Sequence, residues 1–264
     1  MPGATRVCVV GAAGRMGERV RARLAREPGM HLAALLEAPG HPRLGEPFEG
    51  GLPLGDDPKA ALALCDVVID FSTPASTLRL LDAAAARGVP CVIGTTGFSL
   101  AERERIAEIA KRVAIVLAPN FSVAVCVLTH LVREASKRLG PDYDAEILEI
   151  HHRGKRDAPS GTALRLAEAV AEMRGGATEP ALVKTRAGET GARPTGAVGV
   201  QALRGGDNPG EHTVFFLGEG ERLELTHRAA TREHFVTGAL RAARWVVERP
   251  PGLYAMEDVL GLRL

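Results

Sequence analysis

The chain has 264 residues, of which 45% are hydrophobic and 25% charged, so it is long enough for two ordinary globular domains. Its 33 basic and 32 acidic residues leave a net charge of +1, which excludes a broad positive field for nucleic acid or an acidic membrane surface. No window reaches about 18 consecutive apolar residues, so we expect no transmembrane helix, and the N-terminus shows no signal-peptide pattern.

Cysteine usage indicates a reducing compartment. The four cysteines lie in separate apolar runs and form no C-x-x-C pair: Cys8, Cys65, Cys91 and Cys126. Such thiols are usually buried and reduced, so we expect a cytoplasmic protein.

Strand and helix patterns alternate from the N-terminus to residue 120. Apolar, β-rich runs predict strands within residues 6–10, 31–37, 65–72, 89–97 and 113–120. Helical patterns occupy residues 15–27, 74–88 and 99–112, and Pro74 and Gly88 delimit the middle one. This alternation predicts a doubly wound parallel sheet with helices on both faces.

The pattern changes near residue 122. A longer helix is predicted at residues 122–139, a strand at 143–150 and a helix from Thr162 to Met173. Residues 174–210 are rich in Gly, Pro and Thr and show little periodicity, whereas residues 213–218 and 221–227 predict an antiparallel hairpin. The second domain is therefore expected to be α+β. The final helix, within residues 231–249, could belong to either domain.

A glycine-rich turn follows the first strand. Gly11, Gly14 and Gly17 are spaced G-x-x-G-x-x-G and open the first helix. Small residues there let the backbone approach a pyrophosphate, which the helix N–H groups then face. Glu37, at the end of the second strand, stands where a ribose-binding carboxylate belongs. The turn therefore predicts a dinucleotide site; the alternative is a tight turn without a ligand.

The residues around Glu37 favour NADH over NADPH. A carboxylate accepts hydrogen bonds from ribose hydroxyls and repels a 2′-phosphate, and the next residues are Ala38 and Pro39 rather than an arginine. Arg15 could still reach the adenosine end, so NADPH remains open. The loops at residues 94–97 and 118–122 follow strands and could line the nicotinamide side, although plain turns would look the same.

A dense basic cluster follows the strand at residues 143–150. The residues "EIHHRGKRDAPSGTA" at positions 149–163 contain His151, His152 and Lys155, and Ser160 is a good N-cap for the next helix. The N–H groups of Gly161 and Thr162, at the start of that helix, would suit a carboxylate. A solvated basic loop is one alternative. A zinc site is another, although adjacent histidines on a strand point to opposite faces.

A nicotinamide site combined with a carboxylate site predicts a reductase of a small acid. Hydride transfer needs a positioned electrophile and a proton donor, and His151 and Lys155 are the candidates. The segment "GGDNPGEHT", residues 205–213, reads as a flexible subunit contact or lid without a catalytic role.

These motifs carry a family resemblance. The runs at residues 149–163 and 11–17 resemble those of the 4-hydroxy-tetrahydrodipicolinate reductase (dihydrodipicolinate reductase) family. The resemblance covers nearly the whole chain, because further segments fit in order: "DFSTP", "GTTG", "APNFSV", "GEHTVFF", "ERLELTHRA" and "DVLGL".

The resemblance implies a Rossmann-like dinucleotide-binding domain, residues 1–122 and 233–264, with the last helix returning to it. Residues 123–232 would form an α+β domain whose open mixed sheet binds substrate and supports a homotetramer. The implied reaction is NADH- or NADPH-dependent reduction of a cyclic dicarboxylate, 4-hydroxy-tetrahydrodipicolinate, to tetrahydrodipicolinate in lysine and diaminopimelate biosynthesis.

Site residues carry over by motif match. His151 and Lys155 would be catalytic, with no metal involved. The substrate would contact His152, Lys155, Ser160, Gly161 and Thr162. The cofactor would contact Gly11, Ala12, Ala13, Gly14, Arg15, Met16, Gly17, Glu37, Phe71, Gly94, Thr95, Thr96, Ala118, Pro119, Asn120 and Phe121.

Two departures from the family pattern bear on the cofactor. Ala38 and Thr73 stand where many or some members have arginine, which weakens the case for strong NADPH binding. Two functions of other classes remain as alternatives: a sensor that binds a dinucleotide and a dicarboxylate without turnover, and a metal hydrolase that uses His151 and His152.

Overall fold

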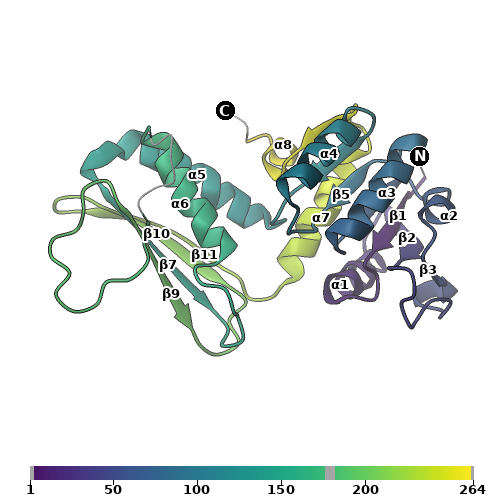
Figure 1. The fold of residues 1–264 in the computed structure, drawn as a ribbon, viewed down its shortest axis with the longest axis horizontal. Coiled ribbons are helices and arrows are strands. Elements are labelled where there is room, and N and C mark those ends of the chain that lie inside the picture. The colour runs from purple at the N-terminus through teal and green to yellow at the C-terminus, as the bar shows by residue number, and fades with distance from the viewer. Residues whose placement is uncertain (1–2, 176–181, 263–264) are drawn as a thin grey trace. The chain divides into compact units, whose positions relative to one another are not determined.

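The computed structural model describes residues 3–175 and 182–262. The chain divides into two compact units, Met1–Ser122 with Glu233–Leu264, and Val123–Arg232. Figure 1 labels the helices and strands of each unit. We call them unit 1 and unit 2.

Unit 1 contains a seven-stranded sheet in which every pairing is parallel. Its strand order is β12-β6-β5-β4-β1-β2-β3. From β1 the chain adds β2 and β3 on one side, and then β4 and the later strands on the other side of β1. The strands are β1 (Thr5–Val10), β2 (Met30–Leu36), β3 (Leu54–Gly55), β4 (Val67–Asp70), β5 (Cys91–Ile93), β6 (Ala114–Leu117) and β12 (Gly252–Tyr254). The predicted doubly wound sheet is confirmed.

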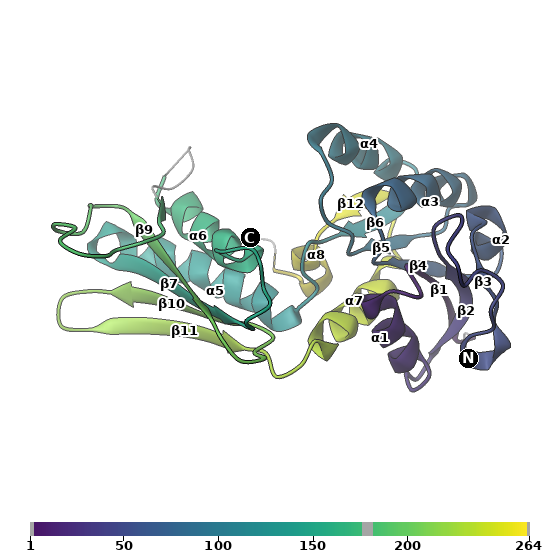
Figure 2. The ribbon, with the colours of Figure 1, turned by 60° about the horizontal axis from the view of Figure 1, so that its bottom comes forward.

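Helices cover both faces of this sheet (Figure 2). One face carries α1 (Arg15–Leu24) and α7 (Glu233–Val246), and the other carries α2 (Pro58–Leu62), α3 (Pro74–Arg87) and α4 (Leu100–Ala110). A short helix, α8 (Met256–Leu260), and a 3-10 turn, η1 (Glu49–Gly51), complete the unit. The final long helix thus belongs to unit 1.

Local sequence signals set the helix ends in unit 1. Thr73 caps α3 by accepting a hydrogen bond from Ser76 N, Pro74 occupies the first turn, and Gly88 ends the helix in the left-handed conformation. Ser99 and Glu102 form a reciprocal capping box at the start of α4. These caps satisfy backbone groups that would otherwise lack partners.

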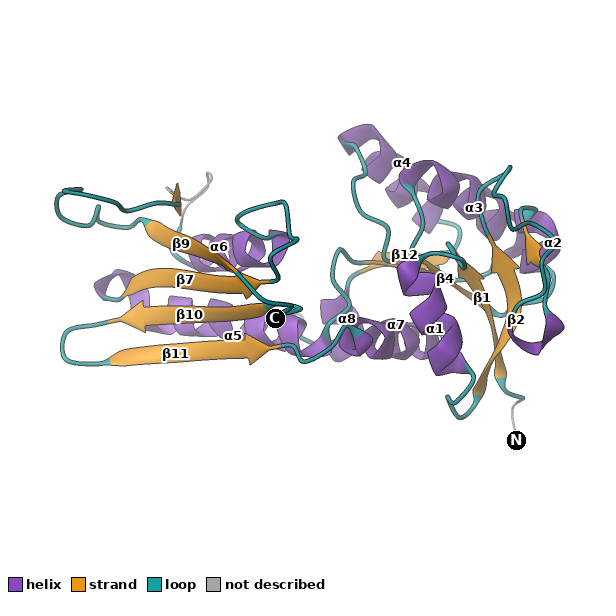
Figure 3. Cartoon of the chain, turned by 90° about the horizontal axis from the view of Figure 1, so that it is seen from below, coloured by secondary structure: helices purple, strands orange, loops and turns teal. Residues whose placement is uncertain are grey.

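Unit 2 is a five-stranded mixed sheet with two helices on one face (Figure 3). Its order is β11-β10-β7-β9-β8, with β7 antiparallel to β10 and parallel to β9. The strands are β7 (Asp144–His151), β8 (Leu182–Val183), β9 (Val198–Arg204), β10 (Glu211–Leu217) and β11 (Arg222–Arg228). The helices are α5 (Val123–Leu139) and α6 (Gly161–Met173), with a 3-10 turn, η2 (Gly140–Asp142), after α5. The hairpin predicted near residue 219 is β10–β11.

Residues 174–210, where the sequence shows little periodicity, contain the strands β8 and β9. Strand β9 begins with three buried residues rather than an alternating pattern, and Gly199 lies within it. Gly199 reads as a strand breaker in isolation, but a Cβ there would lie 1.6 Å from Glu146 Oε2 of β7. A Cβ at this position would therefore displace the Glu146 carboxylate of the neighbouring strand, a contact that only the fold reveals. Residues 176–181 lie outside the described part of the chain.

The cysteines follow the sequence prediction. All four cysteines are buried free thiols, as predicted. Among the helices of the described residues, none is long and apolar enough to cross a membrane.

A glycine in α7 provides a test of packing in unit 1. Gly238 lies against Phe121, and an added Cβ would stand 1.7 Å from the Phe121 carbonyl oxygen. We expect Gly238→Ala to lower the free energy of unfolding by about 1–3 kcal/mol, because the backbone must shift to relieve the overlap. Urea unfolding followed by circular dichroism measures this loss.

Gly55→Ala is the matched control, since its nearest neighbour, Leu35 O, would be 3.6 Å from the new Cβ. Equal urea midpoints for the two variants would contradict the packing argument.

Candidate active site

The glycine turn between β1 and α1 requires two of its glycines. Gly11 has φ +71°, and its Cβ would lie 2.7 Å from Phe71 O. A Cβ on Gly17 would lie 2.1 Å from Gly11 O, so the turn folds back on the first turn of the helix. Gly14 is the N-cap of α1 and provides no side-chain cap. Because glycine has no side chain, the N-cap residue does not occupy the N–H groups at this helix end, as an anion site requires.

Glu37 reaches the same turn from the end of β2. Its Oε1 accepts a hydrogen bond of 2.9 Å from Ala13 N. Within the turn, Ala12 is buried, Ala13 and Met16 are half-buried and Arg15 is exposed. The half-buried carboxylate is thus held beside the predicted pyrophosphate turn, where a ribose would bind.

The loops after β4, β5 and β6 also meet at this sheet edge. A Cβ on Gly94 would lie 2.1 Å from the Phe71 ring, and the rings of Phe71 and Phe121 pack edge to face with centroids 5.8 Å apart. Ala118 N donates to Ile93 O at 3.1 Å, which joins the last two loops. Ala118 is buried, Asn120 is half-buried, and Pro119 and Thr96 are exposed.

A buried carboxylate, Asp70, organises two of these loops. It accepts hydrogen bonds from Ser72 N at 2.8 Å and from the Thr77 hydroxyl at 2.6 Å. The buried Thr95 hydroxyl also accepts from Ser72 N, at 3.0 Å. Burial raises the pKa of Asp70, against hydrogen bonds from Ser72, Thr77 and Thr95 that lower it. Sequence reasoning passed over Asp70, although it closes an apolar strand.

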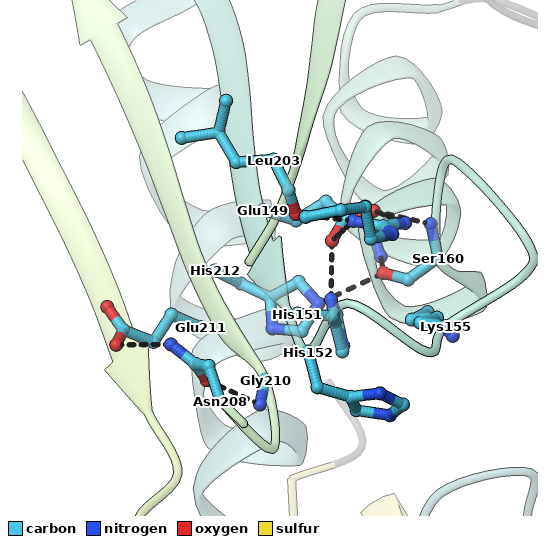
Figure 4. A network of polar contacts seen from close by, with 12 residues as sticks. Glu149, His151, His152, Lys155, Ser160, Leu203, Asn208, Gly210, Glu211 and His212 are labelled. Carbon is cyan, nitrogen blue, oxygen red and sulfur yellow. Dashed lines mark hydrogen bonds and ion pairs between the residues drawn. The ribbon is translucent and has the colours of Figure 1, made fainter. Parts of the chain in front are cut away.

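In unit 2, the basic motif begins where β7 ends (Figure 4). His151 is buried as the last residue of the strand, whereas His152 is half-buried beyond it, with Nε2 3.4 Å from Arg232 Nη2. The half-buried Lys155 donates through Nζ to both oxygens of Asp157, at 2.9 and 2.8 Å. The two histidines do not share one environment.

Ser160 caps α6, as predicted. Its Oγ accepts from Ala163 N at 3.2 Å, Gly161 is the exposed first residue of the helix, and Thr162 is half-buried. The preceding Ala158–Pro159 peptide bond is cis. The start of α6 therefore lies directly after the loop that carries Lys155, and its positive end favours an anion.

Three residues that the sequence did not single out surround His151 and Ser160: Glu149 and His212 are buried, and Arg204 is half-buried. The fully buried Glu149 contacts His151 Nδ1, accepts from Ser160 N at 2.9 Å, and accepts two bonds of 2.8 Å from Arg204. His212 Nε2 lies 3.1 Å from Ser160 Oγ. The segment "GEHT" gave a sequence signal for His212. No local pattern indicates Arg204, which only strand pairing brings beside Glu149.

Burial sets the protonation of this cluster. Burial raises the pKa of Glu149, but hydrogen bonds from Arg204, His151 and Ser160 outweigh it and lower that pKa below its ordinary value. Burial lowers the pKa of His151, helped by Lys155 and Arg204 and opposed by Glu149. Burial and the nearby His151 lower the pKa of His212 to about 3. Glu149 is thus ionised at neutral pH, and both rings are neutral.

The segment expected to be a lid or subunit contact packs on this cluster. Gly205 N donates to His151 O at 3.0 Å, and His152 N donates to Asn208 O at 2.8 Å. Gly210 has φ +149°, and a Cβ there would lie 2.8 Å from His151 Nε2. The loop therefore shapes the space beside Nε2, and this glycine keeps that space open.

The low pKa of His212 predicts a pH-dependent stability. The unfolded chain binds a proton on this histidine below about pH 6.5, whereas the folded chain does so only near pH 3. The free energy of unfolding should therefore fall as pH drops below about 6.5, by about 1.4 kcal/mol per pH unit from this group. Urea unfolding of wild type and His212→Asn at several pH values tests this, since the variant lacks that slope.

Ser160→Ala serves as the comparison. It removes the hydroxyl beside His212 and should lower stability at every pH while retaining the slope. Parallel pH curves for wild type and His212→Asn would contradict the assignment.

The described residues contain no cluster of potential metal ligands. Across residues 3–175 and 182–262, no three or more His, Cys, Asp or Glu side chains gather in a way that could hold a metal ion.

Comparison with known proteins finds relatives that match nearly the whole chain. Residues 5–121 match the family described as "Dihydrodipicolinate reductase, N-terminus", and residues 124–260 match "Dihydrodipicolinate reductase, C-terminus". The chain is 52% identical to the 4-hydroxy-tetrahydrodipicolinate reductase of Anaeromyxobacter dehalogenans, over 98% of each chain. It is 46% identical to that of Geobacter sulfurreducens, over 98% of this chain and 100% of the relative.

A solved structure shows the same fold. The dipicolinate-bound dihydrodipicolinate reductase from Paenisporosarcina superposes with a TM-score of 0.78 at 25% identity, covering 96% of this chain and 98% of the relative. With both halves of the chain matched in order, this protein belongs to the dihydrodipicolinate reductase family.

Proposed function

We propose that this chain reduces 4-hydroxy-tetrahydrodipicolinate to tetrahydrodipicolinate in lysine and diaminopimelate biosynthesis. The observation that carries the proposal is the arrangement of residues 149–163. A buried neutral His151, the Lys155 ammonium and the capped start of α6 lie on one short segment. The curated relatives named for this activity match the whole of the segment's domain and nearly the whole chain.

The cofactor proposal rests on unit 1. A bound nicotinamide dinucleotide would supply the hydride. The backbone of residues 11–17 would hold its pyrophosphate, and Glu37 would accept hydrogen bonds from the adenosine ribose. Phe71, residues 94–96 and residues 118–121 would line the nicotinamide side. The close approaches at Gly11 and Gly17 support this fit, because larger residues would fill the turn.

The substrate proposal rests on unit 2. The N–H groups of Gly161 and Thr162, at the positive end of α6, suit a carboxylate, and Ser160 keeps them oriented as the N-cap. His152 and Lys155 would add charge-assisted hydrogen bonds. The Paenisporosarcina relative was solved with dipicolinate, a ring that carries two carboxylates. A cyclic dicarboxylate therefore suits this segment.

The proton chemistry divides between two residues. Loss of the 4-hydroxyl as water takes up one proton, while the cofactor supplies the hydride. Because burial lowers the pKa of His151, its neutral ring can accept and return a proton at neutral pH. The Lys155 ammonium would donate the proton.

A homotetramer is proposed from the exposed face of the unit 2 sheet. The side chains of β7 alternate, so Leu148 and Ile150 face away from α5 and α6. Leu203, opposite Ile150 in the ladder, is 50% exposed. Pairing of such faces between subunits would cover these apolar groups. A cytoplasmic location, with neither a nucleic-acid nor a membrane partner, stays a prediction from composition.

Turnover is the direct test. The purified protein is mixed with substrate made freshly from pyruvate and aspartate semialdehyde by the preceding synthase, and loss of reduced-nicotinamide absorbance is followed. We expect His151→Gln and Lys155→Ala to lower kcat by about 100-fold or more, because each removes a proton-transfer group. The dissociation constant for NADH should not change, since neither residue belongs to the cofactor site.

Lys137 is exposed on α5 of the same unit. Lys137→Ala removes this cation and should keep wild-type turnover. Tight NADH binding without any oxidation by wild type would favour the sensor, and activity abolished by chelators would favour the hydrolase. Either result would overturn the reductase proposal.

Cofactor choice gives a separate prediction. We propose that NADH is favoured, because Glu37 repels a 2′-phosphate and Ala38 offers no cation. Ala38→Arg should raise the NADPH/NADH ratio of kcat/KM by about tenfold, equivalent to about 1.4 kcal/mol. The ratio is measured with both cofactors at saturating substrate. A wild-type preference for NADPH above about tenfold would contradict the role given to Glu37.

A further inference from the structure

We propose that Glu149 and Arg204 act as a positioning pair for His151: the carboxylate fixes the ring proton on Nδ1, and the guanidinium holds that carboxylate and shares its charge. The proposal rests on the proposed role of His151 in the reduction. Glu149 contacts the ring of His151, Arg204 contacts Glu149, and both act through the ring.

Strand geometry places the three side chains together. Glu149 and His151 are two residues apart on β7, so both point to the face that α6 covers. Arg204 ends β9 and is the register partner of His151 in the parallel β7–β9 ladder. A residue 55 positions away in sequence thus lies beside the carboxylate.

The oxygens of Glu149 are fully used. Oε1 accepts from Ser160 N at 2.9 Å and from Arg204 Nη2 at 2.8 Å. Oε2 accepts from Arg204 Nη1 at 2.8 Å and contacts His151 Nδ1. A carboxylate with four such contacts has one orientation, and the bidentate Arg204 fork sets it.

Arg204 is itself anchored. Its Nη2 also donates to Asp157 O and its Nη1 to Leu203 O, both at 2.7 Å. Arg204 therefore links β9 to the loop between Lys155 and Ser160. The guanidinium holds the carboxylate and the loop of the basic motif in one arrangement.

The contacts of Glu149 decide the tautomer of His151. An ionised carboxylate only accepts hydrogen bonds, so Nδ1 of the ring must carry the proton. In the neutral ring, Nε2 is then left as the acceptor. This is the nitrogen beside Gly210, where a Cβ would come within 2.8 Å. Proton exchange with a bound substrate would therefore pass through Nε2. In other enzymes, a buried carboxylate imposes the same arrangement on a catalytic histidine.

Arg204 limits the effect of the carboxylate on the charge of the ring. The groups around His151 are Glu149 on β7, Arg204 on β9, His212 on β10 and Lys155 in the following loop. Burial, Lys155 and Arg204 lower the pKa of His151, and Glu149 alone raises it. Without Arg204, the carboxylate would favour the imidazolium; without Glu149, the ring would be harder still to protonate.

The opposite signs allow a sharp experiment. The full-length protein is labelled with ¹⁵N-histidine, and the His151 ring signals are assigned by their loss in His151→Gln. Ring nitrogen chemical shifts report the tautomer and the protonation midpoint. Wild type should show the Nδ1–H form. Glu149→Gln should lose that preference and move the midpoint to lower pH, whereas Arg204→Gln should move it to higher pH, each by about one unit.

Two further variants separate positioning from general stability. Glu146→Gln makes the same change on the opposite face of β7, at a residue paired with Arg193, and should leave the His151 signals unchanged. Arg204→Lys retains the charge and should restore the wild-type midpoint. Thermal unfolding checks that each variant is folded.

The wild-type spectrum alone can overturn the proposal, even if the variants do not fold. An Nε2–H tautomer, or midpoints that move in the same direction in Glu149→Gln and Arg204→Gln, would show that the pair does not position the ring. An Nδ1–H ring in a protein that fails to oxidise NADH with substrate would instead overturn the proposed function and leave the pair intact.

Discussion

The buried carboxylate of Glu149 is the constraint on which the arrangement around His151 in unit 2 depends. A buried charge destabilises a protein unless an opposite charge and hydrogen bonds compensate for its lost hydration. Compensation comes here from β9 through Arg204, from the start of α6 through Ser160 N, and from His151 on the same strand. The order of the sheet and the placement of α6 are therefore tied to the geometry of the His151 ring, for which we propose the catalytic role.

Unit 1 contains a buried carboxylate with a different environment. Asp70 ends β4 with 0% of its surface exposed, and its partners are the neutral hydroxyls and N–H groups of Ser72, Thr77 and Thr95. Burial raises the pKa of Asp70, whereas the Arg204 fork helps to lower the pKa of Glu149. Neutral partners can hold two loops together at the sheet edge, but a guanidinium is what keeps Glu149 charged beside a histidine.

Three glycines leave space for neighbouring groups in this structure. Gly17 lets α1 fold back onto Gly11, Gly199 leaves room for the Glu146 carboxylate, and Gly210 leaves room for His151 Nε2. A Cβ at any of these positions would come closer than ordinary contact to a neighbour from another segment. Their role lies in close approach between elements, and the spacing of residues along the chain indicates it only for the turn at residues 11–17.

Sequence by itself determined the alternation of strands and helices in unit 1, the glycine turn with Glu37, the buried cysteines and the Ser160 cap of α6. These features depend on residues within one or two elements, where periodicity, caps and small side chains act locally. Only the tertiary structure decided that β9 lies beside β7, that Arg204 holds Glu149, and that the loop at residues 205–211 shapes the side of His151. Those contacts join residues 53 to 59 positions apart, and no local pattern specifies which strands become neighbours.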